Sequence, residues 1–198
     1  MAYSTGYYAG IEVGSGLSSS GLSSFMLMID SEAVSANVLS SIQTNARSDL
    51  NDVRFSTDTA GNNALNFYKL LAQPAGSKWC FIVGPITYSA STAYQLYMHW
   101  GDSALTTDAS SSSAFASDVL AAYSPRASGL LTDMSGNSQT LTDSGTTAVS
   151  QSTHGSGIYA WTFVEATQLE RTSASLGTLN SSTDTFLECI GRLSSDTD

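Results

Sequence analysis

Residues Lys78–Asp102 read KWCFIVGPITYSASTAYQLYMHWGD, and this stretch decides the fold. It contains two runs that are too apolar to remain in water, KWCFIV and AYQLYMHW, joined by a connector of Gly, Pro, Ser and Thr. Because such a connector lets the chain turn back, we predict two neighbouring strands. The first run is apolar on both faces, which is typical of a central strand buried on each side. The stretch predicts a β-rich scaffold and names no chemistry.

The second run alternates, so its side chains divide between the two faces of a strand. One face carries Tyr94, Leu96, Met98 and Trp100, and the other carries Ala93, Gln95, Tyr97 and His99. At most one of Tyr97 and Trp100 is therefore exposed. Exposed aromatic rings on a sheet can stack on sugars, so Tyr97, Trp100 and Trp161 are candidate carbohydrate-binding residues. The alternative is that they belong to the core, which the alternation of Trp161 with Tyr159 and Phe163 favours.

Composition excludes several classes of partner. The 198 residues suffice for one large or two small domains, and only 12% of them are charged while 41% are hydrophobic. The net charge of −10 argues against binding nucleic acid, whose phosphates it would repel, and against an anionic membrane surface. No apolar run approaches the ~20 residues that a membrane span needs.

The first residues, MAYSTGYYAGIEV, do not combine a basic region with an apolar one, so we expect no signal peptide. Either the chain is made and assembled in the cytoplasm or a leader has been removed, and the initiator Met favours the first. Cys80 and Cys189 lie in apolar, strand-like surroundings. They are either two buried free thiols, which we favour, or a disulfide pair.

Residues 1–24 combine tyrosines with the Gly/Ser run GSGLSSSGLSS at 14–24, whose composition predicts a flexible linker. One interpretation is a frayed terminus with an edge strand. The other is an arm that pairs with a neighbouring subunit, since extended segments can add to open sheet edges. In that case Tyr3, Tyr7 and Tyr8 are the candidate subunit contacts.

Periodicity predicts the remaining elements of the first half. They are a strand at 25–29, an amphipathic helix at 31–46 capped by Ser31 or Ser35, a strand at 52–56 with Val53 and Phe55 on one face, and a strand at 65–71.

The segments DVRF at Asp52–Phe55 and LYMHWGD at Leu96–Asp102 carry a family resemblance. Residues 20–102 resemble an uncharacterised family of small β-sandwich domains in which D-(I/V)-R-F and Y-x-Y-x-G-(N/D) recur in this order. His99 and Trp100 stand where that family more often has tyrosines. The resemblance implies a fold and no enzymatic activity.

In the second half, the turn DMSGN at 133–137 and the segment FVEATQLER at 163–171 resemble a concanavalin A-like or laminin-G-like domain. Together the two resemblances imply the context of phage structural proteins and of secreted surface proteins. They also imply a division of the chain into an arm and linker at 1–24, a β-sandwich domain at 25–102, a Ser-rich linker at 103–118 and a partial concanavalin A-like domain at 119–198.

Candidate chemistry is sparse. The carboxylates are scattered, His99 and His154 have no G-x-S-x-G segment to accompany them, and the two cysteines lack zinc-site spacing. We therefore predict that the chain is not an enzyme and has no cofactor, with calcium as the one exception. Asp133, Ser135 and Asn137 place oxygen atoms on alternate residues of a turn, as calcium requires. The alternative, which we favour, is an Asx-type turn.

These observations predict an all-β protein of antiparallel sandwich or jelly-roll domains with one short helix. The predicted function is that of a non-catalytic structural or decoration protein of an extracellular assembly, a phage virion, where it contacts other subunits and forms a homo-oligomer. The alternative is a carbohydrate-binding module of a secreted or cell-surface protein, with cell-surface glycans as its partners.

Overall fold

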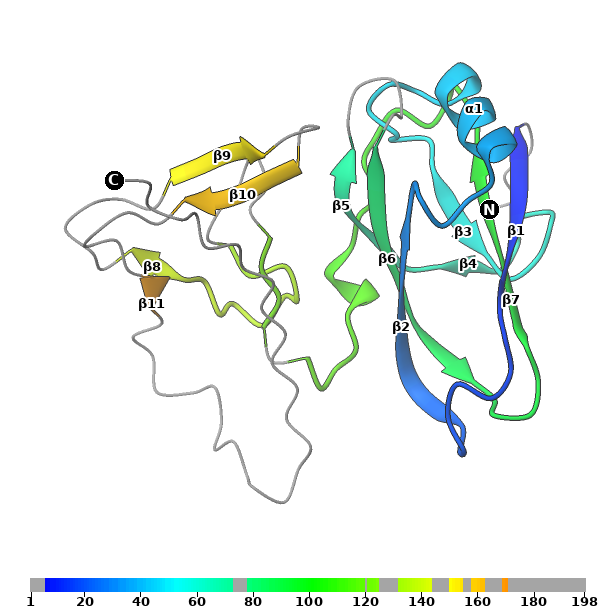
Figure 1. Ribbon diagram of the computed structural model, residues 1–198, viewed down its shortest axis with the longest axis horizontal. Helices are drawn as coiled ribbons and strands as arrows, with labels where there is room; N and C mark the ends of the chain where they lie inside the picture. The colour runs from blue at the N-terminus through cyan, green and yellow to red at the C-terminus, as the bar shows by residue number, and fades with distance from the viewer. Residues whose placement is uncertain are drawn as a thin grey trace, which may run out of the picture.

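Two antiparallel sheets make the framework of the first half of the chain (Figure 1). A computed structural model describes residues 6–72, 78–119, 121–124, 132–143, 150–154, 158–162 and 169–170. The first sheet has the order β1 (Tyr7–Val13), β7 (Tyr94–Trp100), β3 (Arg54–Ser56) and β4 (Ala64–Leu65). The second has the order β2 (Leu22–Asp30), β6 (Trp79–Tyr88) and β5 (Phe67–Ala72). The predicted all-β sandwich with one short helix is confirmed.

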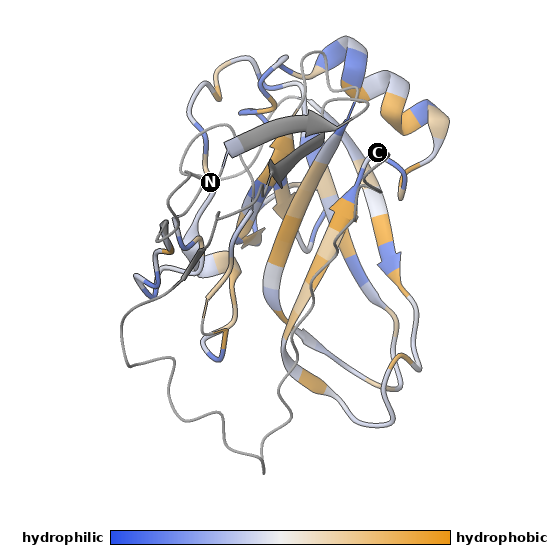
Figure 2. Cartoon of the chain, turned by 60° about the vertical axis from the view of Figure 1, so that its left-hand side comes forward, coloured by the Kyte–Doolittle hydropathy of each residue, from blue (hydrophilic) through white to orange (hydrophobic). Residues whose placement is uncertain are grey.

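The core lies between these two sheets. Phe55 of the first sheet contacts Phe67 and Phe81 of the second, with ring centroids 5.4 Å apart in each pair. The rings of Trp79 and Phe81 have their centroids 5.7 Å apart, and Met98 of β7 belongs to the same buried cluster. Figure 2 shows that the hydrophobic residues are concentrated on the strands. Alternate side chains of each strand therefore point into one shared hydrophobic core.

The predicted pairing of the two apolar runs is wrong, because β6 and β7 belong to different sheets. β6 does not end at Gly84 and Pro85 but continues to Tyr88, and the chain turns at Ser89 and Thr92, which form an isolated bridge. After that turn β7 enters the first sheet, between β1 and β3. The first run is nevertheless a central strand, as predicted, with β2 and β5 on its two sides.

Gly84 and Pro85 form a bulge in β6 in place of the predicted turn. Leu27 lies opposite Val83 while Phe25 lies opposite Ile86, so β6 carries one extra residue at this point. The extra residue changes which positions face the core, and Val83 and Ile86 are both buried. A Cβ at Gly84 would lie 3.0 Å from the Phe25 carbonyl oxygen, so the close approach of β2 favours glycine here.

The predicted strand at 65–71 is divided between the two sheets. Ala64 and Leu65 pair with β3, whereas residues from Phe67 onward pair with β6. The carbonyl of Asn66, between them, accepts a hydrogen bond from Gly84 N at 3.0 Å. Alternation cannot reveal such a crossing, because both pieces contribute inward side chains to one core.

The predicted helix is present but shorter, since α1 spans Ala36–Asn45. Ser35 is the N-cap and accepts from Val38 N at 3.4 Å, which selects one of the two predicted caps. Residues before Ser35 do not continue the helix, because Asp30 Oδ1 accepts from Glu32 N and Ala33 N and closes a turn. Ile42 is 1% exposed and joins the core, so the helix covers one end of the sandwich.

The remaining described strands form two separate pairs. β9 (Ser150–His154) pairs with β10 (Ile158–Thr162), and β8 (Thr142–Asp143) pairs with β11 (Leu169–Glu170). The predicted concanavalin A-like domain falls largely outside the described residues and stays a prediction. Among the helices that the structure describes, none has the length and apolar character that a membrane crossing requires.

Candidate functional site

The exposed large apolar side chains of the described residues lie on two consecutive strands and on the loop that joins them. The large hydrophobic residues that remain exposed are Tyr7, Tyr8, Leu17 and Met28, at 50–65% exposure. Tyr7 and Tyr8 lie on β1, Met28 lies on β2, and Leu17 lies in the loop that joins the two strands. We call β1, β2 and the joining residues 14–21 the β1–β2 side.

Within the part of the chain that the structure describes, both strands of the β1–β2 side are edge strands of their sheets. An edge strand presents unpaired backbone groups, and proteins commonly protect such edges with charged residues, especially Lys, or with Pro. The β1–β2 side, residues 7–30, contains two charged residues, Glu12 and Asp30, and no proline. This side therefore combines open strand edges with apolar side chains and almost no charge, which is typical of a surface that contacts another chain.

The loop of the β1–β2 side is fastened to the end of β6. The hydroxyl of Tyr88 donates to the Gly14 carbonyl at 2.8 Å and accepts from Leu17 N at 3.0 Å, and Gly16 N donates to the Ala90 carbonyl at 3.1 Å. Tyr88 itself is 1% exposed. The Gly/Ser run predicted as a flexible linker is thus held by the sandwich, and its last residues, Leu22–Ser24, already belong to β2.

The tyrosines predicted as subunit contacts are held in place within their own chain. β1 pairs along its whole length with β7, from Tyr7 opposite Trp100 to Val13 opposite Tyr94. Tyr7 stacks on Trp100 with centroids 6.2 Å apart, and Tyr8 meets the ring of Tyr97 edge-on at 6.0 Å. These rings are half exposed and already oriented. Tyr3 lies outside the described residues.

The predicted carbohydrate-binding residues are not brought together. Trp100 is 3% exposed and belongs to the core, whereas Tyr97 is half-buried on the outer face of the first sheet, beside Tyr8. Trp161 lies on β10 opposite Gln151, and its side chain is outside the described part of the chain. On the described surface, Tyr8 and Tyr97 are the aromatic pair that a sugar could reach.

The predicted calcium ligands form an Asx-type turn. The Asp133 carboxylate accepts from Ala122 N, Ser135 N, the Ser135 hydroxyl and Gln139 N, at 2.7–3.0 Å. Burial opposes ionisation of Asp133, but these hydrogen bonds prevail and lower its pKa. Asn137 is turned away, since its Nδ2 donates to the Val119 carbonyl. Within the described residues, no group of three or more His, Cys, Asp or Glu is placed to hold a metal ion.

We expect neither calcium nor a chelator to change the melting temperature of the chain. The Asp133 oxygens already accept four hydrogen bonds, so calcium would have to displace donors that the fold supplies. Differential scanning fluorimetry with millimolar calcium and then with EDTA checks this. A shift of several degrees on chelation would show that a metal is bound.

A pair that the sequence did not predict joins β7 to β3, where His99 Nε2 is 2.7 Å from Ser56 Oγ. The Ser56 hydroxyl donates to the Asp58 carbonyl at 2.6 Å, so it accepts from Nε2 and the neutral ring carries its proton there. A serine that accepts from histidine is not activated as a nucleophile. Ser56 is fully buried and His99 is 6% exposed, so we interpret the pair as a structural contact.

We expect the chain to be less stable at pH 5 than at pH 7, in part because of His99. Burial lowers the pKa of His99 below its ordinary value, so the unfolded chain takes up this proton at a higher pH than the folded chain does. The contribution of neutral His99 to the free energy of unfolding is therefore present above the unfolded-state pKa of ~6.5, and it decreases as the pH drops below that value. Urea unfolding at the two pH values measures the loss, and His99→Gln should reduce it. An equal loss in the variant would contradict this role.

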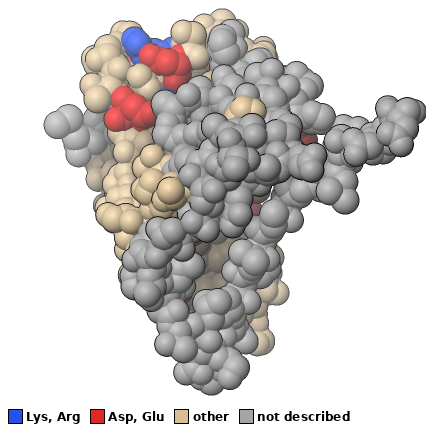
Figure 3. Space-filling view, turned by 90° about the vertical axis from the view of Figure 1, so that its left-hand side faces the viewer, with Lys and Arg blue, Asp and Glu red and all other residues tan. Residues whose placement is uncertain are grey.

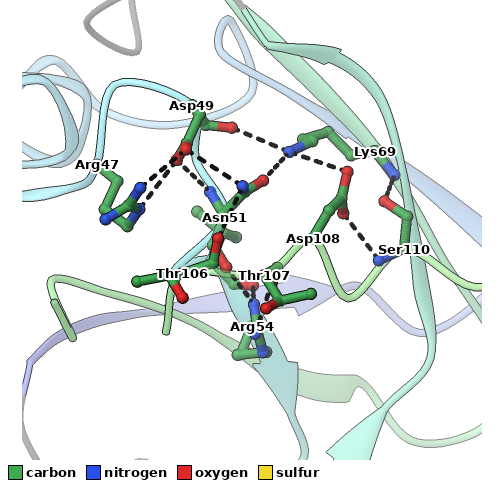
Figure 4. Close-up of polar contacts among 10 residues, drawn as sticks. Arg47, Asp49, Asn51, Arg54, Lys69, Thr106, Thr107, Asp108 and Ser110 are labelled. Carbon is green, nitrogen blue, oxygen red and sulfur yellow. Dashed lines mark hydrogen bonds and ion pairs between the residues drawn. The ribbon is translucent and has the colours of Figure 1, made fainter. Parts of the chain in front are cut away.

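Lys69 is the centre of a second polar group, drawn in Figure 4. Its ammonium donates to Asn51 Oδ1 at 2.6 Å and to the Asp49 carbonyl at 2.9 Å, and it pairs with Asp108 at 3.2 Å. Its side chain is only 10% exposed. The three partners use all three N–H donors of the Lys69 ammonium. Lys69 therefore stabilises the fold and has no donor left for a ligand.

The same group fastens residues 106–110 to the sandwich. Asn51 Nδ2 donates to the Thr106 carbonyl at 3.2 Å, and Lys69 N donates to Ser110 Oγ at 3.0 Å. The 3-10 helix η2 (Ser112–Ala114) follows, and the ring of Phe115 lies 5.4 Å from Tyr68 of β5. The segment predicted as a Ser-rich linker thus packs on the outer face of the second sheet.

On the face drawn in Figure 3, the most visible charged side chains gather at the end of the molecule where Figure 1 draws α1. The exposed pair of Lys78 and Glu32, 2.8 Å apart, lies near the start of β6. Residues 6–29 carry little of the net charge of −10, because Glu12 is their one charged residue.

No protein-family model matches this chain, and neither a curated protein nor a solved structure matches it. The family resemblances of the two halves therefore stay predictions. The function is argued below from the geometry of the β1–β2 side and from the composition of the chain.

Proposed function

We propose that this chain is a non-catalytic structural or decoration protein of an extracellular assembly, and that the assembly is a phage virion. The observation that carries the proposal is the β1–β2 side, where two open strand edges coincide with the exposed Tyr7, Tyr8, Leu17 and Met28. Such a surface is stabilised when another chain covers it, because apolar area leaves water and the strand edges gain partners.

The composition of the chain supports a role in contact with other proteins. Only 12% of the residues are charged, and the net charge of −10 would repel packaged nucleic acid. A shell of protein subunits is therefore the expected neighbour. The phage context itself comes from the predicted family resemblance of residues 20–102.

Density-gradient sedimentation tests this function. Particles are collected from the culture that produces the chain, banded on a gradient, and probed with an antibody against the chain. We expect the chain to band with the particles in a constant ratio to the major shell protein. A chain that stays at the top of the gradient as a free monomer contradicts the proposal.

One observation favours a second candidate function, a carbohydrate-binding module of a secreted or surface protein. Tyr8 is 55% exposed and meets Tyr97 on the outer face of the first sheet, and aromatic rings on a flat β surface suit the apolar faces of sugars. A glycan array tests it directly. Binding that is lost in Tyr97→Ala would support the module, and an array at background level for the unaltered chain would reject it.

A further inference from the structure

We infer that β1 pairs antiparallel with β1 of a second copy of this chain, around a two-fold axis at Gly10. The inference rests on the proposed function, because it assigns the partner of the β1–β2 side. It would join the four-stranded sheets of two copies into one continuous sheet through their open edges.

The length and position of β1 select this register. β1 spans Tyr7–Val13, so Gly10 is its midpoint, and a two-fold axis there pairs all seven residues of each copy. An axis one residue away in either direction leaves two residues of each strand unpaired. Gly10 itself has no side chain at the axis, and the Tyr8 rings of the two copies flank it on the outer face, an arrangement known to support edge glycines.

The position of Glu12 favours this register between two copies over an axis at Glu12. With the axis at Gly10, Glu12 of each copy lies opposite Tyr8 of the other, so the carboxylate faces a phenol hydroxyl. The two Glu12 residues are then four positions apart along the ladder, roughly 13 Å. An axis at Glu12 would instead place like charges directly opposite, which is destabilising. Because Glu12 is the one charge between residues 6 and 29, two copies can approach here despite a net charge of −10 each.

The side chains of β1 suit the same pairing. Tyr7 would lie opposite Val13 and Ala9 opposite Ile11, which extends the apolar inner face of the first sheet across the axis. Tyr7 and Tyr8 are already oriented by Trp100 and Tyr97, so little side-chain freedom is lost on association. Preformed aromatic anchors of this kind carry much of the affinity at interfaces.

Sedimentation velocity on the full chain over a range of concentrations measures the association. We expect a monomer–dimer equilibrium in the unaltered chain. Tyr8→Glu, which places a second carboxylate directly opposite Glu12 of the other copy, should weaken the dimer at least about tenfold. Met28→Glu is the matched control, since Met28 is 65% exposed on the other edge strand, and it should leave the dimer intact. Thermal unfolding of both variants checks that they are folded. A dimer sensitive to Met28→Glu and not to Tyr8→Glu would overturn the inference.

Cross-linking tests the register in a chain that carries Cys80→Ser and Cys189→Ser. Directly opposite residues of an antiparallel pair lie within reach of a disulfide. Tyr8→Cys and Glu12→Cys chains, oxidised separately, should remain uncross-linked, because like positions are roughly 13 Å apart. Mixed, they should form a disulfide-linked dimer. Cross-linking of either variant with itself, or none in the mixture, overturns this register.

The two proposals fail in distinguishable ways. A chain that is monomeric at all concentrations, yet bands with particles on the gradient, overturns pairing through β1 and leaves the structural function standing. A chain that dimerises through β1 but never bands with particles supports the pairing and overturns the function.

Discussion

Replacing Phe81 by alanine is expected to lower the free energy of unfolding by about 3–5 kcal/mol. Phe81 is fully buried at the centre of β6, and its ring contacts Phe55 across the sandwich at 5.4 Å and Trp79 and Phe67 within its own sheet at 5.7 and 5.9 Å. Its removal leaves a cavity that rigid aromatic neighbours cannot fill. Urea unfolding followed by tryptophan fluorescence measures the change.

Phe25→Ala is the matched control for this change. Phe25 lies on β2 of the same sheet but is only half-buried, and its ring contact is with Tyr88 at 5.9 Å. Its truncation should cost about 1 kcal/mol, since less area leaves the core and no enclosed cavity forms. Equal losses in the two variants would contradict the placement of the core between the sheets.

Asp52→Ala is expected to lower the free energy of unfolding by about 2–4 kcal/mol. Asp52 is 1% exposed, and its two carboxylate oxygens accept from Arg47 N at 3.1 Å and from Gly101 N at 2.8 Å. The carboxylate thereby joins the segment after α1 to the end of β7. Without it, two backbone N–H groups lose their acceptor in a poorly hydrated place.

Asp102→Ala gives the comparison for Asp52. Asp102 accepts a hydrogen bond from Ala104 N at the surface, where water can replace it, so the expected loss is about 0.5 kcal/mol. Denaturant unfolding of both variants under the same conditions measures the difference. A loss for Asp52→Ala no larger than that for Asp102→Ala would show that the carboxylate does not join the two segments.

Much of the local structure could be predicted from the sequence. The alternation of residues 94–100, the inward positions Val53 and Phe55 and the Ser35 cap follow from local periodicity and local hydrogen bonding. The placement of β6 and β7 in different sheets could not be predicted, because alternation shows which face of a strand is apolar and not which sheet the strand joins. Gly84 and Pro85 are typical of a turn, but they form a bulge where β2 approaches closely at Phe25.

The polar groups of the structure were beyond sequence reasoning for a different reason. Ser56 and His99 are 43 residues apart, and Lys69 pairs with Asp108, which lies far along the chain in the segment that packs against β5. Such contacts have no spacing signal, and only the topology brings them together. Tyr7 and Tyr8 stay predicted subunit contacts, based on the tyrosines near the N-terminus, whereas their anchoring on Trp100 and Tyr97 required the register of β1 on β7.

Hydrogen exchange by mass spectrometry, on the free chain and on the chain in its assembly, tests the central claim that this protein acts through the edge of β1. We predict that amides in residues 7–13 exchange more slowly in the assembly, because those that point away from β7 gain a partner. Amides of α1 should exchange equally in both states. Unchanged exchange in β1, together with new protection elsewhere in the chain, would contradict the claim.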